Sequence, residues 1–127
     1  AAGGIVEQAG RYLFIKRHGK WDIPKGKLDK GEDPAAGCVR EIEEECGITA
    51  PVIDRLVLET YHTYRYKETP TIKKTYWYAL TYEGNEVPFP QEEEGITKAK
   101  FVKTEKLDKI RINTYASILE VMDAYFK

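Results

Sequence analysis

Residues 26–48 read GKLDKGEDPAAGCVREIEEECGI, and our prediction for the whole chain starts from these residues. They predict a helix of about 13 residues, because Asp33 can cap the first free amides and Pro34 suits the first helical position. Gly47 supplies the stop, since glycine readily takes the left-handed conformation that ends many helices. Within this helix, residues 40–45 hold four carboxylates in six positions.

Two faces appear when this helix is turned by about 100° per residue. Glu41, Glu44 and Glu45 share one face, at positions i, i+3 and i+4. Like charges at this spacing repel by a few tenths of a kcal/mol per pair, so something must offset the repulsion. Solvation is one explanation, because runs of charge are often wet helix faces, and a divalent cation with oxygen ligands is the other. The other face is apolar and predicted to pack on the core: Ala35, Val39, Ile42 and Cys46.

Gly37 lies on the acidic side of the expected helix, one turn before Glu41. A glycine inside a helix costs about 1 kcal/mol relative to alanine, so its presence needs a reason. Bare backbone there would leave room for an ion or a phosphate, or it would relieve a tight contact of the helix. The sequence leaves both explanations open.

The fixed spacings in residues 26–48 resemble the signature of the Nudix hydrolases. That signature is a glycine, an acid six residues later, then Arg-Glu, an aliphatic residue, any residue, Glu-Glu, any residue, glycine and an aliphatic residue. Residues 21–25 and 2–6 also resemble this family, but only residues 26–48, the Nudix box, are highly specific. Every fixed position is met in register: Gly26, Glu32, Arg40, Glu41, Ile42, Glu44, Glu45, Gly47 and Ile48.

The resemblance implies a reaction and a set of ligands. The reaction is hydrolysis of a diphosphate linkage in a nucleoside diphosphate-linked compound, an acid anhydride of phosphorus, with Mg²⁺ or Mn²⁺ as cofactor. By position in the motif, Glu41, Glu44 and Glu45 are the expected metal ligands and catalytic residues. A backbone carbonyl near Gly26 would add a further ligand.

The same resemblance implies supporting roles. Arg40 and Glu32 are similar to an orienting pair, because Arg40 can bridge acids and fix their rotamers beside the reaction. Glu43 occupies the free position of the motif and is expected to be dispensable. Nudix hydrolases often use a further acid from a loop near the last strand, and the resemblance does not fix which of residues 92–94 that is. Glu94 best fits the Glu-Gly-Ile pattern before an expected strand, although a solvated acidic loop fits equally well.

Residues 16–30 are expected to form a loop rich in glycine and lysine, just before the acidic helix. Positive charge at this place would suit a metal-bound polyphosphate, and a solvated loop is the alternative. Lys27, beside the glycine of the box, is the first candidate for binding the substrate's phosphates, and Lys25 is the second. Trp21 would pack in the core or stack on a nucleobase.

The rest of the chain is predicted to form strands and one more helix. Residues 3–17 read as a hairpin that turns at residues 8–10. Residues 51–66 and 72–82 form a second hairpin that turns at residues 68–70, and Arg65 near its tip would bind substrate or be structural. A short strand at residues 101–102 and an amphipathic helix from about residue 113 follow. This order indicates an α+β fold with a mixed sheet between helices, and the resemblance sharpens it to a Nudix α/β/α sandwich.

Composition and cysteine content bound the class of protein. A chain of 127 residues is expected to form one domain, residues 1–127, and its net charge of −1 argues against a non-specific polyanion binder. Cys38 and Cys46 would lie about 12 Å apart along the helix, too far to pair. Free thiols suggest a reducing, cytoplasmic setting. No apolar run approaches the roughly 18 residues of a membrane span.

The substrate is set by loops outside the box. The basic lead-in favours nucleoside or dinucleoside polyphosphates over ADP-ribose, nucleotide sugars and diphosphoinositol polyphosphates. The expected partner is therefore a small nucleotide, with no nucleic acid polymer and no membrane, and we expect a monomer or a homodimer. The alternative is a non-catalytic, nucleotide-sensing Nudix domain. Such domains often lose glutamates of the box, and this chain keeps all of them.

Overall fold

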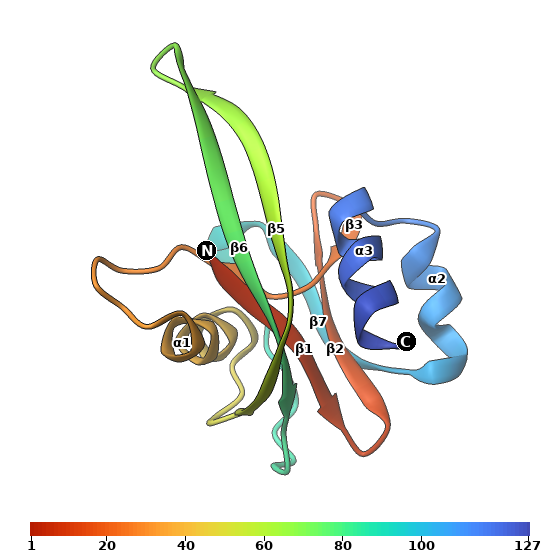
Figure 1. Cartoon of the computed structure of the whole chain (residues 1–127). Coiled ribbons are helices and arrows are strands. Elements are labelled where there is room, and N and C mark those ends of the chain that lie inside the picture. Colours follow the sequence, from red (N-terminus) through yellow and green to blue (C-terminus); the bar gives the residue numbers. More distant parts are fainter.

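The computed structural model describes residues 1–127 as a mixed seven-stranded sheet with helices on both faces (Figure 1). The main strand order is β3-β2-β1-β6-β5, with β4 paired to β1 and β7 paired to β2. The strands are β1 (Ala2–Gln8), β2 (Arg11–Arg17), β3 (Lys20–Asp22), β4 (Lys25–Gly26), β5 (Val52–Tyr66), β6 (Thr69–Thr81) and β7 (Ile96–Lys103). The helices are α1 (Pro34–Cys46), η1 (Glu92–Glu94), η2 (Thr104–Lys106), α2 (Leu107–Arg111) and α3 (Ala116–Tyr125), where η marks a 3₁₀ turn.

Helix α1 is confirmed in extent and in both caps. The Asp33 carboxylate accepts a hydrogen bond from the Ala36 amide at 3.2 Å, and Pro34 is the first helical residue. Gly47 ends the helix with a φ of 68°, and its amide donates to the Glu43 carbonyl at 2.9 Å. Local sequence alone therefore sets both ends of the helix.

The first hairpin is also confirmed, with Ala9 and Gly10 in its turn at φ of 50° and 78°. The prediction of a continuous loop over residues 16–30 is wrong, because two short strands lie within it. Lys20–Asp22 pairs with β2, and Lys25–Gly26 pairs with the start of β1. Strands of two or three residues exist only because a partner strand lies beside them, so local pattern does not reveal them.

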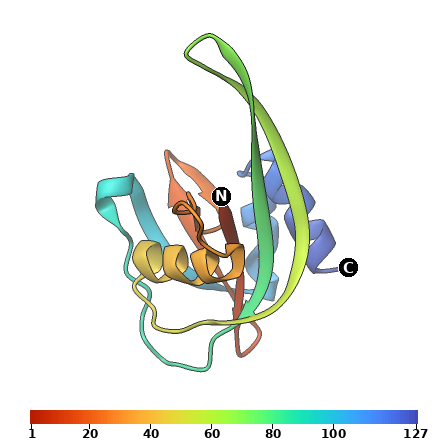
Figure 2. The same cartoon turned by 60° about the vertical axis from the view of Figure 1, so that its left-hand side comes forward.

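The second hairpin is confirmed and extends beyond the body of the molecule (Figures 1 and 2). Its turn lies at Lys67 and Glu68, both with positive φ, slightly earlier than predicted. Strand β6 runs parallel to β1, from Ala2 opposite Tyr76 to Glu7 opposite Thr81. This parallel pair makes the sheet mixed and brings β6 beside β1 and its partner β4.

The C-terminal third contains more structure than predicted. Strand β7 runs over residues 96–103 along β2, whereas the predicted strand covered only residues 101–102. Helix α2 was missed, and α3 begins at Ala116, a few residues after the predicted start. The many lysines of this segment hide the apolar alternation on which the prediction depended.

Two cores lie on opposite faces of the sheet, which confirms the α/β/α sandwich. One lies under α1 and contains Ile42, Cys38 and Cys46, and both cysteines are free. The other lies under α2 and α3 and contains Trp77 and Trp21. Trp21 is 9% exposed, so it packs in the core. None of the helices is long and apolar enough to cross a membrane.

Candidate active site

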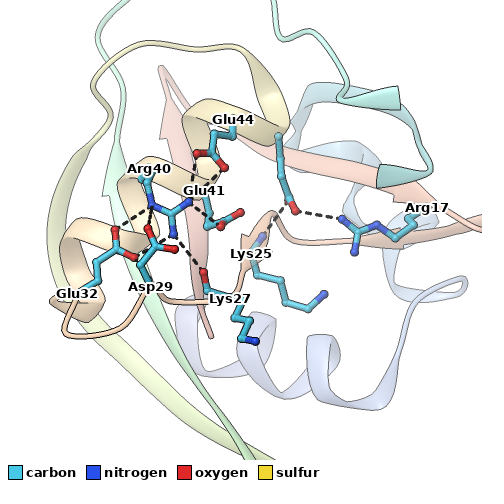
Figure 3. A network of polar contacts seen from close by, with 9 residues as sticks. Arg17, Lys25, Lys27, Asp29, Glu32, Arg40, Glu41 and Glu44 are labelled. Carbon is cyan, nitrogen blue, oxygen red and sulfur yellow. Dashed lines mark hydrogen bonds and ion pairs between the residues drawn. The ribbon is translucent and has the colours of Figure 1, made fainter. Parts of the chain in front are cut away.

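Arg40 is the centre of a polar network on the exposed side of α1 (Figure 3). Its Nε and Nη2 donate to the two carboxylate oxygens of Glu32 at 2.8 and 2.9 Å. Its Nη1 donates to Glu41 at 2.9 Å and to both oxygens of Glu44 at 3.1 and 3.2 Å. Nη2 also reaches the Lys27 carbonyl at 3.1 Å. One guanidinium thus ties the loop before the helix to two acids of the helix, and its hydrogen bonds lower the pKa of Glu32 to about 2.

Glu45 lies deeper, with only 5% of its side chain exposed. One of its carboxylate oxygens accepts a hydrogen bond from Arg17 Nη2, and the other accepts one from the Lys25 amide, each at 3.1 Å. Burial raises the pKa of Glu45 to about 7, against the opposing effect of Arg17 and the Lys25 amide. A carboxylate in this position is stabilised by any further positive charge that comes beside it.

Glu41 lies between these two groups and packs on the backbone of Gly26. A Cβ atom at residue 26 would lie 1.9 Å from Glu41 Oε2 and 2.0 Å from its Cδ. Burial raises the pKa of Glu41 as well. Only glycine at this position lets the carboxylate lie against the strand, which gives the box glycine a steric reason.

Glu41 and Glu45 line one hollow of about 250 Å³ between α1, β4 and the loop before β7. Glu41, Glu45 and Glu94 form its acidic lining. Lysine and arginine side chains form the rest, together with Gly26: Arg17, Lys25, Lys27 and Lys73. A cavity that offers carboxylates beside four cationic residues suits a metal-bound, polyanionic ligand.

Lys73 and Arg17 are the members of this hollow that the sequence did not single out. Lys73 comes from β6, 25 positions after the end of the box, and burial together with Lys25 and Arg17 lowers its pKa. It enters the site because β6 lies beside β1, and β1 carries β4 on part of its other edge. No local signal in residues 70–76 separates it from an ordinary strand lysine.

Of the remaining predicted site residues, one lines the hollow and the others lie elsewhere. Glu94 lines the hollow, whereas Glu92 and Glu93 line a different depression together with Glu44. Glu44 is 48% exposed and faces Arg40. Arg65 lies at the tip of the second hairpin, where it donates to the Glu68 carbonyl at 2.9 Å, and the structure does not bring it to the hollow.

Gly37 is explained by packing rather than by room for a ligand. A Cβ atom there would lie 2.2 Å from Leu28 Cδ2 and 3.0 Å from Glu32 Oε1. The residue is buried against the loop that carries Glu32. The glycine therefore lets this loop approach α1, and the idea that it leaves space for an ion or phosphate is wrong.

The carboxylates of the hollow are chemically suited to bind a divalent cation. Glu41 and Glu45 offer hard oxygen ligands from one helix face, beside the backbone of Gly26 and inside a partly enclosed hollow. No three His, Cys, Asp or Glu side chains converge closely enough to hold an ion in this structure. Arg40 contacts Glu41 at 2.9 Å, and Arg17 contacts Glu45 at 3.1 Å. Glu44 would have to leave Arg40 to join the other two.

Comparison with known proteins identifies relatives of the whole fold. The family model described as NUDIX domain matches residues 1–122. A MutT-like protein of Streptomyces ambofaciens is 43% identical over 53 residues, covering 40% of this chain and 34% of that protein. An RNA pyrophosphohydrolase of Vibrio atlanticus is 35% identical over 65 residues, covering 50% of this chain and 37% of that protein. The matched segments thus span little more than a third of these relatives.

Solved structures match over nearly the full chain. The C. elegans Ap4A hydrolase, in a binary complex, superimposes with a TM-score of 0.71 at 22% identity, covering 98% of this chain and 92% of that one. The NUDIX domain of Shewanella oneidensis NrtR, complexed with ADP ribose, gives a TM-score of 0.73 at 14% identity and covers 98% and 83%. At these identities the likeness establishes the fold.

Proposed function

We propose that this chain, which belongs to the Nudix family, is a metal-dependent pyrophosphohydrolase that cleaves a nucleoside diphosphate-linked substrate. The observation that carries this proposal is the hollow in which Glu41, Glu45 and Glu94 face lysine and arginine side chains. Acids alone would repel a diphosphate, and cations alone would bind it without activating water. The combination supports hydrolysis.

The residues would divide the work as follows. Glu41, Glu45 and the Gly26 carbonyl would hold Mg²⁺ or Mn²⁺, with Glu44 as a further ligand. When bound, such an ion neutralises phosphate oxygens and makes bound water more acidic. Arg40 would keep Glu41 in position through its 2.9 Å contact. Glu94 takes part in no ion pair of the structure, so it is free to accept a proton from the attacking water.

Lysines in the hollow would bind the substrate's phosphates. Lys25, Lys27 and Lys73 line it together with Arg17; Arg17 already pairs with Glu45 and Lys25 with Asp22, which leaves Lys27 and Lys73 as the cations without an ion-pair partner. A second hollow, lined by Lys27, Lys73 and the hairpin residue Tyr64, adjoins the first through the two shared lysines. The continuity of charge supports a nucleoside or dinucleoside polyphosphate, a class that includes the Ap4A in the name of the C. elegans Ap4A hydrolase.

A panel assay tests this proposal. Diadenosine tetraphosphate, nucleoside triphosphates, ADP-ribose and 5′-triphosphorylated RNA are each incubated with the protein and Mg²⁺, and the products are separated and identified. We expect metal-dependent cleavage of a phosphoanhydride bond, fastest with one of the polyphosphates. Absence of cleavage across the panel with both Mg²⁺ and Mn²⁺ would refute the proposed activity.

Variants of the acidic helix test the assigned residues. Glu44→Gln and Glu45→Gln should each lower turnover by orders of magnitude, because the neutral amide is a poor ligand of a hard cation. Glu43→Gln is the matched control on the same helix. Glu43 accepts a hydrogen bond from the Ala50 amide at 2.7 Å, and the glutamine oxygen can replace it, so near-normal turnover is expected. Wild-type rates for both Glu44→Gln and Glu45→Gln would overturn the assignment.

Nucleotide sensing without hydrolysis is the second candidate, and the NrtR NUDIX domain complexed with ADP ribose provides a structural parallel. It predicts calorimetric binding of a nucleotide without metal-dependent release of product. The complete set of box glutamates favours catalysis.

We further propose that residues 1–127 act as one Nudix domain in the cytoplasm, with a small nucleotide rather than a polymer as ligand. Two buried free thiols support a reducing compartment.

A further inference from the structure

Four lysines three positions apart surround a hollow on the face of the sheet opposite the candidate active site. Lys100 is near the end of β7, Lys103 ends it, Lys106 belongs to η2 and Lys109 to α2. Lys106 and Lys109 lie three positions apart in the helical segment of η2 and α2, where such residues share one side, and Lys100 and Lys103 approach the hollow from the end of β7. Together with Trp21, Phe101, Val102 and Ile110, they line a hollow of about 230 Å³.

These ammonium groups lack carboxylate partners. The lysines in ion pairs are Lys25 and Lys74, and the four around this hollow form none. Glu105 and Asp108 belong to the same segment but do not line the hollow. Like charges gathered in this way repel one another, so an anion that enters between them would lower the free energy of the site.

An aromatic ring lies at the base of this lysine cluster. Lys100 Nζ lies 5.3 Å from the centre of the Trp21 ring, and Lys16 Nζ lies at the same distance. The ring is largely buried and packs in the core under α2 and α3. The ring face attracts the Lys100 ammonium and gives the hollow an apolar base.

The lysine hollow is separate from the candidate active site. The two hollows share no residue, and the acidic helix α1 and helix α2 cover opposite faces of the sheet (Figures 1 and 2). The net charge of −1 conceals this segregation of charge within the chain. A domain without an excess of positive charge can therefore still carry one strongly basic site.

We propose that this hollow, formed by Lys100, Lys103, Lys106 and Lys109, is a second anion site that binds a chain of consecutive phosphates. A single monoanion would leave most of the four ammonium groups uncompensated. An RNA strand would need a track of cations along the surface, whereas these cations surround one compact hollow. Phosphates joined by anhydride bonds carry several charges in a small volume, and they are available in free polyphosphate and in the tail of a nucleotide.

The test follows the indole N–H signals of the two tryptophans by NMR, in EDTA and without divalent metal. Trp21 forms the base of the lysine hollow, whereas Trp77 donates to Thr60 at 2.8 Å in the interior and serves as an internal reference. The Trp77→Phe variant assigns the two signals, because it removes one of them. If Trp77→Phe does not fold, Thr60→Val assigns them instead, because it removes the acceptor of the Trp77 indole N–H and shifts only that signal. The probes are tripolyphosphate, ATP, an RNA oligonucleotide without a 5′-triphosphate and, at matched ionic strength, sulfate.

We expect tripolyphosphate to shift the Trp21 signal saturably. The triple variant Lys103→Gln/Lys106→Gln/Lys109→Gln should weaken this binding at least tenfold and leave hydrolysis unchanged, while arginine at the same positions should retain it. Lys25→Gln/Lys27→Gln/Lys73→Gln removes three charges from the other face and should leave the Trp21 shift in place.

A shift with ATP as well would assign the site to phosphate chains in general, and a shift with tripolyphosphate alone would assign it to free polyphosphate. An equal response to sulfate, a response only to an RNA oligonucleotide without a 5′-triphosphate, or an unchanged affinity in the glutamine triple variant would each overturn the proposal.

Discussion

Gly26→Ala is the substitution that most directly tests how the backbone positions the Glu41 carboxylate, which we propose to be catalytic. The new Cβ would lie 1.9 Å from Glu41 Oε2, and ordinary contact needs at least 3.4 Å, so the oxygen must move by about 1.5 Å. Misplacing a reacting group by about 1 Å can cost 100-fold in rate, which is about 2.7 kcal/mol in the activation free energy. We therefore expect turnover to fall by about 100-fold.

Folding should be affected much less than turnover. The atoms that must move are at the end of a flexible side chain, which is 14% exposed and can turn outward. Gly26 does not have a positive φ, so its backbone conformation accepts alanine. Thermal unfolding of the variant should stay close to that of the wild type, while kcat falls.

A double-mutant cycle separates this mechanism from a general disturbance of the site. If Gly26→Ala acts by displacing Glu41, then Glu41→Gln should cost a similar factor, and the double variant should be no slower than either single one. The measurements are kcat and KM on the substrate found in the panel assay. Losses that multiply in the double variant, or a Gly26→Ala variant with normal turnover, would refute the reasoning.

Three further predictions concern neighbouring groups. Because its guanidinium partner lowers the pKa of Glu32 from 4.5 to about 2, Glu32 contributes stability that is fully present above pH 4.5 and is lost as the pH falls toward 2. Glu32→Gln should therefore lower the unfolding temperature at neutral pH and converge with the wild type near pH 2. Cys38 and Cys46 are buried, and burial raises the pKa of Cys38 to about 12, so neither thiol should react with Ellman's reagent until guanidinium unfolds the chain; rapid labelling of the native protein would contradict this. Lys73→Gln should raise KM more than it lowers kcat, as steady-state kinetics would reveal, and an unchanged KM would remove Lys73 from the substrate site.

The parts of the fold that were predictable are those that neighbouring residues determine. The ends of α1 follow from Asp33, Pro34 and Gly47, which act within a few positions of themselves. The turn at Ala9 and Gly10 is equally local. Strands β3 and β4 were missed because each exists only beside a distant partner, and α2 was missed because five residues carry too little periodicity.

The same distinction applies to the candidate site. Glu41 and Glu45 could be proposed from the sequence, because residues four positions apart in a helix lie on the same face. Lys73 could not, since it reaches the hollow only through the pairing of β6 with β1. The choice of Glu94 among three adjacent glutamates depends on the 3₁₀ turn that directs its neighbours elsewhere.

Arg40 also explains why the acidic helix is stable before any cation binds. Its contacts at 2.9 Å with Glu41 and at 3.1 Å with Glu44 offset repulsion between acids that lie one turn apart. Arg17 does the same for Glu45 from the strand side. From the sequence, either solvation or a metal ion could offset the repulsion between the glutamates of the helix. The structure adds a third explanation, which is pairing with the arginine side chains. A divalent ion that binds here would then compete with arginines already in place, so its affinity should rise when Arg17 is replaced by glutamine, provided that Glu45 is a ligand. An unchanged Mg²⁺-dependent rise in unfolding temperature for Arg17→Gln would show that this competition does not occur.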